Sequence, residues 1–403
     1  MKILIIAHDY TPRLTPRALR WSAIVNYWIS LGYEVDIVSG PPKNPAKGKP
    51  LRKTYGAFAK WIYDRTWKNI YWPDYACLWF FSAFRRASRL LKKKRYDVIV
   101  SVSLPFTGHL VAYSLRKRFC GAIWLVDIGD PFYYPFKIPE LRWNNQALYA
   151  RLNYFIEQRI LNVCHIVTVT TAPVRDMYLA TFRHVTSKIH VIPPMRSDAP
   201  RELKKNDLFR GNNVKRLVYI GTLYQGIRNP AYLLGLLHGL QEVGLPDIWR
   251  IHFLGNVNNC ESIFQEYASL LGDKLYVHGP VTHGESLEAM QSADILVNIG
   301  NATSFQLPSK VVEYAATGKP ILNIISLEED STKKFLEDYP AVLHIKQERR
   351  SPTVDVLQKV KEFILHPPSM NEETATKWRN RYGVEAIGGE YEYIIRAYAK
   401  EGE

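Results

Sequence analysis

The chain alternates short apolar segments with longer segments of helical periodicity, and this order constrains the fold more than any other feature. The apolar segments have the length of strands, and between them apolar side chains recur every three or four residues, as on one face of a helix. Strands are expected at 2–7, 34–38, 97–102, 122–128, 165–170, 189–192, 216–220, 249–254, 275–278, 293–298 and 320–325. Helices are expected at 17–31, 78–94, 108–119, 145–162, 231–242, 261–271, 285–292 and 310–317. Repeated strand–helix–strand units predict an α/β protein whose sheets are parallel and doubly wound.

A length of 403 residues exceeds what one compact core organises and suits two α/β domains. Two consecutive prolines followed by the polar stretch 196–213 have the composition of a linker. We therefore predict an N-terminal domain over 1–195, a C-terminal domain over 196–375, and a C-terminal helix within 376–403 that packs back on the N-terminal domain. Two Rossmann-like domains facing across a cleft would bring the carboxyl ends of both sheets around a substrate.

The composition excludes several classes of protein. Hydrophobic residues make up 47% of the chain, which is ordinary core material, and no apolar run approaches the roughly 20 residues of a membrane span. The opening residues, Met1 to His8, predict a first strand rather than a signal peptide. Four scattered cysteines without Cys-x-x-Cys spacing predict reduced thiols, so we expect a cytoplasmic protein.

The net charge of +15 is concentrated in one segment. Between Lys43 and Tyr96, fifteen Lys or Arg residues stand against two Asp residues, with Trp, Tyr and Phe interleaved among them. A basic aromatic insertion over about 42–95 is what an element at an anionic membrane surface requires. Alternatively, the aromatic residues of this insertion belong to the core, and its basic residues form the solvated face of a helix. Nucleic acid is not an expected partner, because no nucleic-acid fold signature accompanies the charge.

Residues 306–322 predict a binding site for an anion. A helix is expected to open, just after Pro308 and Ser309, at the carboxyl end of a parallel strand. Unpaired N–H groups and a partial positive charge gather at such a helix start, and Lys310 adds a full charge. Glu313, one turn later, faces the same side and can accept hydrogen bonds from a diol such as a ribose. The alternative is an ordinary strand–loop–helix crossover.

This arrangement resembles the nucleotide-sugar site of GT-B glycosyltransferases, in particular family 4. In that family a loop of this type meets the donor, and a downstream glutamate holds the ribose. The resemblance spans nearly the whole chain and implies a nucleotide-sugar substrate, UDP- or GDP-linked, with no cofactor. It implies a donor site made of Gln306, Leu307, Pro308, Ser309, Lys310 and Glu313.

The resemblance extends to residues 219–230, which look like the first phosphate loop of the family's second domain. Gly221 permits close approach of the backbone to a phosphate. Arg228, where the family usually has lysine, can grip phosphate oxygens in a fork, or it is a surface charge at a helix start. Two positions depart from the family: Thr222 replaces an arginine, and Phe305 replaces the first glutamate of a Glu-x7-Glu pair. The departure at Phe305 leaves the retention or inversion of anomeric configuration open.

Candidate catalytic residues follow a strand of the first domain. Asp127 and Asp130 lie at its carboxyl end, and Asp130 is the leading candidate for a general base or for positioning the acceptor hydroxyl. Its alternative role is to cap the following turn. Related glycosyltransferases have a basic residue where this chain has Gly129. His109 can reach the same cleft, or it is a satisfied histidine at a helix start.

Arg17 and Arg20, three residues apart at a helix start, are candidates for binding an anionic acceptor such as a lipid diphosphate. Alternatively, both arginines belong to an ordinary charged helix surface and bind no acceptor. The chain has no Asp-x-Asp at a suitable loop and no His or Cys cluster, so we expect no metal site. In a metal-independent reaction, Arg228, Lys310 and helix termini would offset the charge of the leaving diphosphate.

Together these features predict a glycosyltransferase on the inner face of the cytoplasmic membrane. It would transfer a sugar from a nucleotide diphosphate to a lipid-linked or polysaccharide acceptor during the assembly of envelope glycans of the bacterial type. One alternative is a GT-B-like nucleotide-sugar epimerase, which acts on the free donor. The other is a non-catalytic protein that binds glycans or membranes, because three positions depart from the family pattern.

Overall fold

The structure is a computed structural model that describes residues 1–41, 66, 70–119, 121–133, 144–182, 185–197, 209, 214–348 and 351–401. Half of the predicted basic insertion, 42–65 and 67–69, lies outside the described residues, as does most of the predicted linker. The chain divides into two compact units, Met1–Pro193 with Ile387–Glu403 and Pro194–Ala386. It therefore passes between the units at 193/194 and at 386/387, where the sequence suggested 195/196 and 375/376.

The first unit is built on a six-stranded parallel sheet with the order β2-β1-β3-β4-β5-β6. Its strands are β1 Lys2–Ala7, β2 Glu34–Ser39, β3 Val98–Ser103, β4 Ile123–Ile128, β5 Ile166–Val169 and β6 Ile189–Val191. Each lies within one residue of the predicted bounds at either end. Strand β3 is buried along its whole length and β4 in all but its first residue, as expected when helices cover both faces of a parallel sheet.

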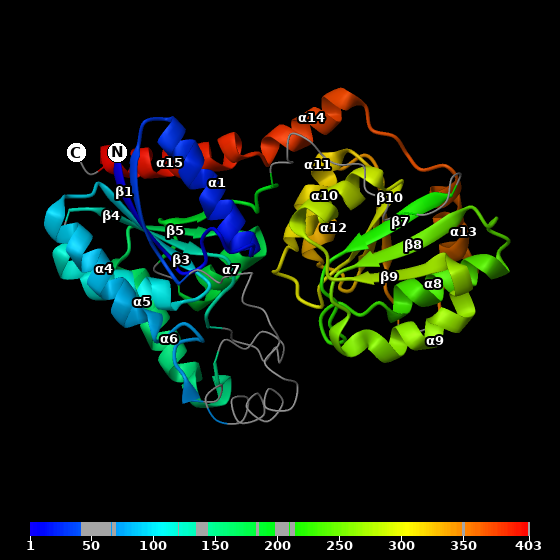
Figure 1. The fold of residues 1–403 in the computed structure, drawn as a ribbon, viewed down its shortest axis with the longest axis horizontal. Coiled ribbons are helices and arrows are strands. Elements are labelled where there is room, and N and C mark those ends of the chain that lie inside the picture. Colours follow the sequence, from blue (N-terminus) through cyan, green and yellow to red (C-terminus); the bar gives the residue numbers. More distant parts are fainter. Residues whose placement is uncertain are drawn as a thin grey trace. The chain divides into compact units, whose positions relative to one another are not determined.

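Helices cover this sheet on both faces (Figure 1). They are α1 Pro16–Ser30, α4 Trp79–Lys93, α5 Thr107–Leu115, α6 Gln146–Val163, α7 Ala172–Thr181 and α15 Val384–Glu401. Helices α4, α5 and α6 form one layer, in which α5 contacts both of the others. The sequence analysis missed α7, although Thr171 caps its first turn by accepting from the Val174 amide, and Pro173 stands in that turn.

The second unit repeats the plan with the strand order β12-β11-β10-β7-β8-β9, again all parallel. Its strands are β7 Lys215–Ile220, β8 Trp249–Leu254, β9 Leu275–Gly279, β10 Ile295–Ile299, β11 Ile321–Ile325 and β12 Val342–Lys346. Its helices are α8 Ala231–Glu242, α9 Glu261–Leu271, α10 His283–Ser292, α11 Ser309–Thr317, α12 Ser331–Phe335, α13 Val354–Leu365 and α14 Glu372–Arg381. Elements β12, α12 and α13 were not predicted.

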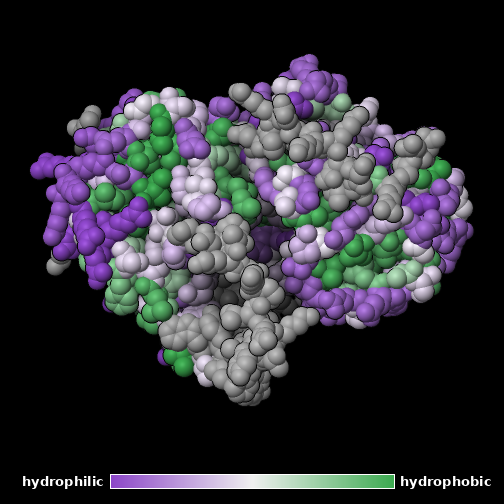
Figure 2. Space-filling view, viewed as in Figure 1, coloured by the Kyte–Doolittle hydropathy of each residue, from purple (hydrophilic) through white to green (hydrophobic). Residues whose placement is uncertain are grey.

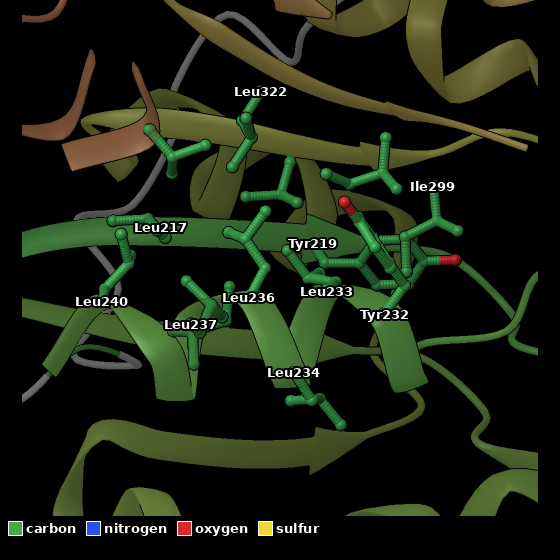
Figure 3. Close-up of a cluster of buried hydrophobic side chains, with 14 of the residues drawn as sticks. Leu217, Tyr219, Tyr232, Leu233, Leu234, Leu236, Leu237, Leu240, Ile299 and Leu322 are labelled. Carbon is green, nitrogen blue, oxygen red and sulfur yellow. The ribbon is translucent and has the colours of Figure 1, made fainter. Parts of the chain in front are cut away.

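Two apolar layers hold this second sheet. On one face, leucines of α8 pack against side chains of β7, β10 and β11, including Leu217, Ile299 and Leu322 (Figure 3). On the other face, α10 and α11 bury a second cluster with Trp378 and Tyr382. These two aromatic residues therefore belong to the second unit. The sequence grouped them with the helix that packs on the first.

A buried polar network joins α15 to the first unit. The hydroxyl of Tyr391 on α15 donates to Asp127 Oδ1 at 2.6 Å and accepts from Arg20 Nη2 at 3.0 Å. On α1, Trp28 Nε1 donates to the carbonyl oxygen of Gly388 at 3.1 Å. Because an unmatched polar group in such a site costs free energy, these contacts fix how α15 lies against α1.

Replacing Tyr391 with Phe should lower the free energy of unfolding by about 1–3 kcal/mol, because Asp127 and Arg20 each lose a buried partner. Urea denaturation measures this. The matched control is Tyr393→Phe on the same helix, where the side chain is 73% exposed and the change should stay within about 0.5 kcal/mol. Equal stability of the two variants would contradict the proposed importance of the network.

Candidate functional site

The carboxyl end of β7 forms the base of the site in the second unit. Gly221, directly after the strand, has φ of 155°, and a Cβ there would lie 3.1 Å from the Tyr219 hydroxyl and 3.5 Å from Arg228 Nη1. The Arg228 side chain is held in place by two acceptors. Its Nε donates to Asn301 Oδ1 at 2.8 Å, and its Nη1 donates to the Thr222 carbonyl oxygen at 3.1 Å. The loops after β7 and β10 thus meet at this guanidinium.

The loop after β10, residues 300–308, is fixed by several further contacts. The Ala302 amide donates to the carbonyl oxygen of Ile227 at 2.8 Å. Ser331 Oγ, at the start of α12, donates to the carbonyl oxygen of Gln306 at 2.6 Å. Gly300 has no room for a side chain, because a Cβ there would overlap the Asp330 carboxylate. The sequence analysis did not single out Asn301 or Ser331, which belong to segments far apart from Arg228 in the chain.

Helix α11 opens at the end of this loop, as predicted. No side chain caps its N-terminus, which follows Pro308, and among its first amides that of Val311 donates to the Pro308 carbonyl oxygen at 3.1 Å. The hydroxyl of buried Tyr314 accepts from the Ile220 amide at 2.8 Å and so fixes α11 to the end of β7. Lys310 Nζ lies 2.8 Å from Glu313 Oε2, so the two predicted donor residues share one face of the helix.

Glu313 has two further neighbours that the sequence analysis missed. Its Oε1 accepts from Ser197 Oγ at 2.8 Å. His283 lies in the first turn of α10, close to both Glu313 and Lys310. Burial lowers the pKa of His283, the negative charge of Glu313 raises it, and the positive charge of Lys310 lowers it; the net effect is a decrease.

Of the remaining predicted donor residues, Leu307 and Pro308 complete the loop, and Ser309 begins α11. Thr222 contributes its carbonyl oxygen to Arg228. The second unit therefore brings the predicted donor residues to one edge of its sheet, through the chain of contacts from Arg228 to Asn301 and on to Gln306.

In the first unit, Asp127 has a structural role. It is 1% exposed and accepts from Arg17 Nη1 at 3.3 Å, Trp21 Nε1 at 2.9 Å, Thr168 Oγ1 at 2.8 Å and the Tyr391 hydroxyl at 2.6 Å. Burial raises the pKa of Asp127, but Arg17 and the hydrogen bonds outweigh this, so the pKa is lower than usual. A carboxylate with four internal donors does not fit the predicted catalytic role.

His109 and Arg20 are likewise buried. His109 is fully buried on α5, its Nδ1 lies 2.8 Å from Ser101 Oγ, and burial lowers its pKa to about 3. Arg20 donates to the carbonyl oxygens of Pro193 at 2.6 Å and Ile192 at 3.2 Å, and to Tyr391. The predicted catalytic role of His109 and the predicted acceptor role of Arg20 are therefore corrected to structural ones, because neither side chain is accessible.

Asp130 and Arg17 remain as a candidate pair at the carboxyl end of β4. Asp130 is partly exposed. A Cβ on Gly129 would overlap the Arg17 guanidinium, so the absence of a side chain at Gly129 is what lets Arg17 lie there. Arg17 thereby brings a cation beside Gly129, the position at which the family resemblance predicts a basic side chain.

Glu157 on α6 anchors the loop that follows Asp130. The Tyr133 amide donates to Glu157 Oε2 at 2.8 Å, and the Tyr178 hydroxyl donates to its other oxygen. Phe132, between these loop residues, stacks on Phe106 with ring centroids 3.8 Å apart. Two independent contacts, one polar and one aromatic, therefore fix the backbone beside Asp130.

Within the described ranges, no group of three or more His, Cys, Asp or Glu side chains has the geometry of a metal site. None of the helices described is both long and apolar enough to cross a bilayer.

The chain resembles known proteins both in part of its sequence and in its fold. Residues 21–196 match the family model described as Glycosyltransferase Family 4. The chain is similar in structure to a glycosyltransferase from Rickettsia africae ESF-5, with a TM-score of 0.62, 11% identity, and coverage of 99% of this chain and 98% of that one. It is also similar to Anabaena Alr3699/HepE, with a TM-score of 0.60, 11% identity, and coverage of 98% and 100%.

A third structure of this fold is a putative UDP-N-acetylglucosamine 2-epimerase from Listeria monocytogenes, with a TM-score of 0.58, 11% identity, and coverage of 99% and 96%. None of the curated proteins compared matches the sequence. The chain has the GT-B fold, built from two Rossmann-like domains, and less than half of it, residues 21–196, matches the family model. The resemblance to family 4 inferred from the sequence is confirmed, and the family match lies almost wholly in the first unit.

The carboxyl group of Glu157 should make stability depend on pH. Burial raises the pKa of Glu157 from 4.5 to about 7, although hydrogen bonds from Tyr178 and Tyr133 lower it. Between these values the native state holds a proton that the unfolded state has lost, so stability falls as pH rises. The contribution is fully present below 4.5 and is lost above 7, a change of about 3 kcal/mol.

Glu157→Gln cannot lose a proton, so its stability relative to the native sequence should increase by about 2–3 kcal/mol between pH 4.5 and 8. Urea denaturation at both pH values provides the test. Exposed Glu266→Gln should show no such trend. A difference that is independent of pH would show that Glu157 is ionised in the native state throughout.

Proposed function

We propose that this chain is a glycosyltransferase that moves a sugar from a nucleotide-diphosphate sugar to a lipid-linked or polysaccharide acceptor in the assembly of envelope glycans. The observation that carries the proposal is the convergence of Arg228, Lys310 and the uncapped start of α11 at one edge of the second sheet. Two cations and a helix N-terminus are what a diphosphate requires. Alr3699/HepE, which shares the fold, has been crystallised with UDP and with UDP-glucose.

In the proposed donor complex, the fork of Arg228 and the charge of Lys310 bind the diphosphate, while Glu313 accepts from the ribose diol. These positive groups then stabilise the negative charge that grows on the leaving diphosphate, so no metal ion is assigned to this step. Because Asn301 and Thr222 already orient Arg228, little reorganisation is needed when the donor binds. UDP- or GDP-linked sugars are the proposed donors.

For the acceptor side we propose that Asp130 orients or deprotonates the attacking hydroxyl, with Arg17 beside it to attract an anionic acceptor. The loop anchored by Glu157 supports this assignment, because a catalytic carboxylate must be held in a fixed position.

A nucleotide-sugar epimerase is the second candidate, favoured by the likeness to the putative Listeria epimerase over nearly the whole chain. Such an enzyme rearranges the free donor and needs no acceptor. Phe305 is 3% exposed at the position where family 4 has a glutamate, and this departure favours the third candidate, a non-catalytic binding protein. Incubation with nucleotide sugars separates the three: slow hydrolysis indicates a transferase, rearrangement an epimerase, and an intact donor a binding protein.

Peripheral association with an anionic membrane is proposed for the surface of α4. Leu78 and Phe81 are exposed at the start of this helix, at 68% and 66%. The rest of its outer face is cationic and carries no acidic residue, and Figure 2 shows hydrophilic residues gathered over this helix. The exposed cations on α4 are Arg85, Arg86, Arg89, Lys92 and Lys93. An apolar start beside a cationic face suits an element that lies in the headgroup region.

Lys310→Ala and Arg228→Ala should each weaken UDP or GDP binding by about 10- to 100-fold, because each removes a charged partner of the diphosphate. Isothermal titration calorimetry gives the affinity. Lys334→Ala, an exposed lysine on neighbouring α12, is the matched control and should bind as the native chain does. Unchanged affinity in both site variants would remove the donor-site assignment.

Arg85→Glu combined with Arg89→Glu should reduce binding to vesicles of anionic lipid at least about tenfold, since each cation near such a surface contributes about 1 kcal/mol. Sedimentation with vesicles measures it. The control pair Lys359→Glu and Lys377→Glu changes the net charge equally on exposed positions of α13 and α14. If both pairs bind equally, or if salt and lipid charge have no effect, α4 is not a membrane contact.

A further inference from the structure

The carboxylate of Glu313 is already occupied on both oxygens. Lys310 Nζ lies 2.8 Å from Oε2, and Ser197 Oγ donates to Oε1 at 2.8 Å. Glu313 is 9% exposed, so its remaining access to solvent is narrow. A ribose diol can therefore bind this carboxylate only by displacing a group that is already bound to it, such as the Ser197 hydroxyl on Oε1.

Ser197 belongs to the connector, the segment 194–197 with which the chain enters the second unit. Its neighbour Arg196 donates its amide to the Tyr382 carbonyl oxygen at 2.9 Å and its Nε to the Arg379 carbonyl oxygen at 2.9 Å. Tyr382 and Arg379 lie shortly before the chain leaves this unit at 386/387. Both passages of the chain are thus tied together next to Glu313.

The surroundings leave space for Ser197 to move. A cavity of about 150 Å³ adjoins the Ser197–Glu313 contact. Polar residues of its lining are Arg196, Ser197, Gln291, Glu313, Thr317 and Arg379. This volume corresponds to several water molecules at roughly 30 Å³ each, so a displaced hydroxyl group finds solvent and polar partners rather than a packed core.

We infer that Ser197 is a competitor of the donor within the donor site: its hydroxyl holds the position of a ribose hydroxyl on Glu313 until the nucleotide displaces it. The inference deepens the proposed function and rests on it. Displacement of Ser197 frees one anchor of the connector, so donor occupancy and the mobility of the connector are linked. By reciprocity, whatever holds the connector in place lowers the affinity for the donor.

The competition has a signature that distinguishes it from a supporting role. If Ser197 competes, removal of its hydroxyl raises nucleotide affinity. If Ser197 only orients Glu313, its removal lowers affinity, because the carboxylate loses a fixed position. The sign of the change therefore decides between the two roles.

The test measures the affinity of the full chain for UDP and for GDP by calorimetry. We expect Ser197→Ala to bind about two- to tenfold more tightly than the native chain, the equivalent of one hydrogen bond. Ser197→Thr, which keeps the hydroxyl, should bind as the native chain does. Exposed Ser269→Ala on α9 is the control and should leave affinity unchanged.

A second readout follows the connector directly. Hydrogen exchange of the Arg196 amide, which is bonded to Tyr382, should become faster on addition of nucleotide to the native chain. In the Ser197→Ala variant, exchange of the Arg196 amide should already be fast without nucleotide, and addition of nucleotide should not change its rate. Equal or weaker binding by Ser197→Ala, or an unchanged exchange response, would overturn the inference while leaving the donor site intact. If neither nucleotide binds the native chain, the proposed function fails, and the inference fails with it.

Discussion

The hydrogen bond from the Ile220 amide to the Tyr314 hydroxyl holds the proposed donor site together. It joins the end of β7 to the middle of α11, in a fully buried position where neither group has access to water. A buried amide must have a partner, so this contact fixes how far α11 extends beyond the sheet. The start of α11, Lys310 and Glu313 therefore lie at the same edge as Arg228.

Charge serves two different purposes in the two units. Asp127 and Arg20 are buried, and their hydrogen bonds hold α1, α15 and the sheet together. Arg228 donates to Asn301 and to the Thr222 carbonyl oxygen, and Lys310 pairs with Glu313; in the proposed donor site these contacts fix the direction of both cations.

Most of the secondary structure followed from periodicity, and the exceptions have physical reasons. The central strands are continuous apolar runs because both of their faces are covered. Strand β12 lies at the edge of its sheet and is only partly buried. Its short sequence mixes polar and apolar residues, so it lacks the apolar run by which the other strands were predicted. Helix α12 has five residues, too few to show a period. Helix α7 is different, because Thr171 as N-cap and Pro173 in the first turn are a sequence pattern typical of a helix start.

The sequence by itself determined the two parallel sheets, the helix start at Ser309 and the shared face of Lys310 and Glu313, because these depend on local spacing along one strand or one helix. Only the tertiary structure decided that Asn301 orients Arg228, that Ser197 contacts Glu313, and that Asp127 is buried under Tyr391. Those partners are separated by dozens to hundreds of residues, and the chain brings them together only through packing. Local spacing therefore predicts which side chains share a surface, while packing decides which of them remain free to bind a ligand.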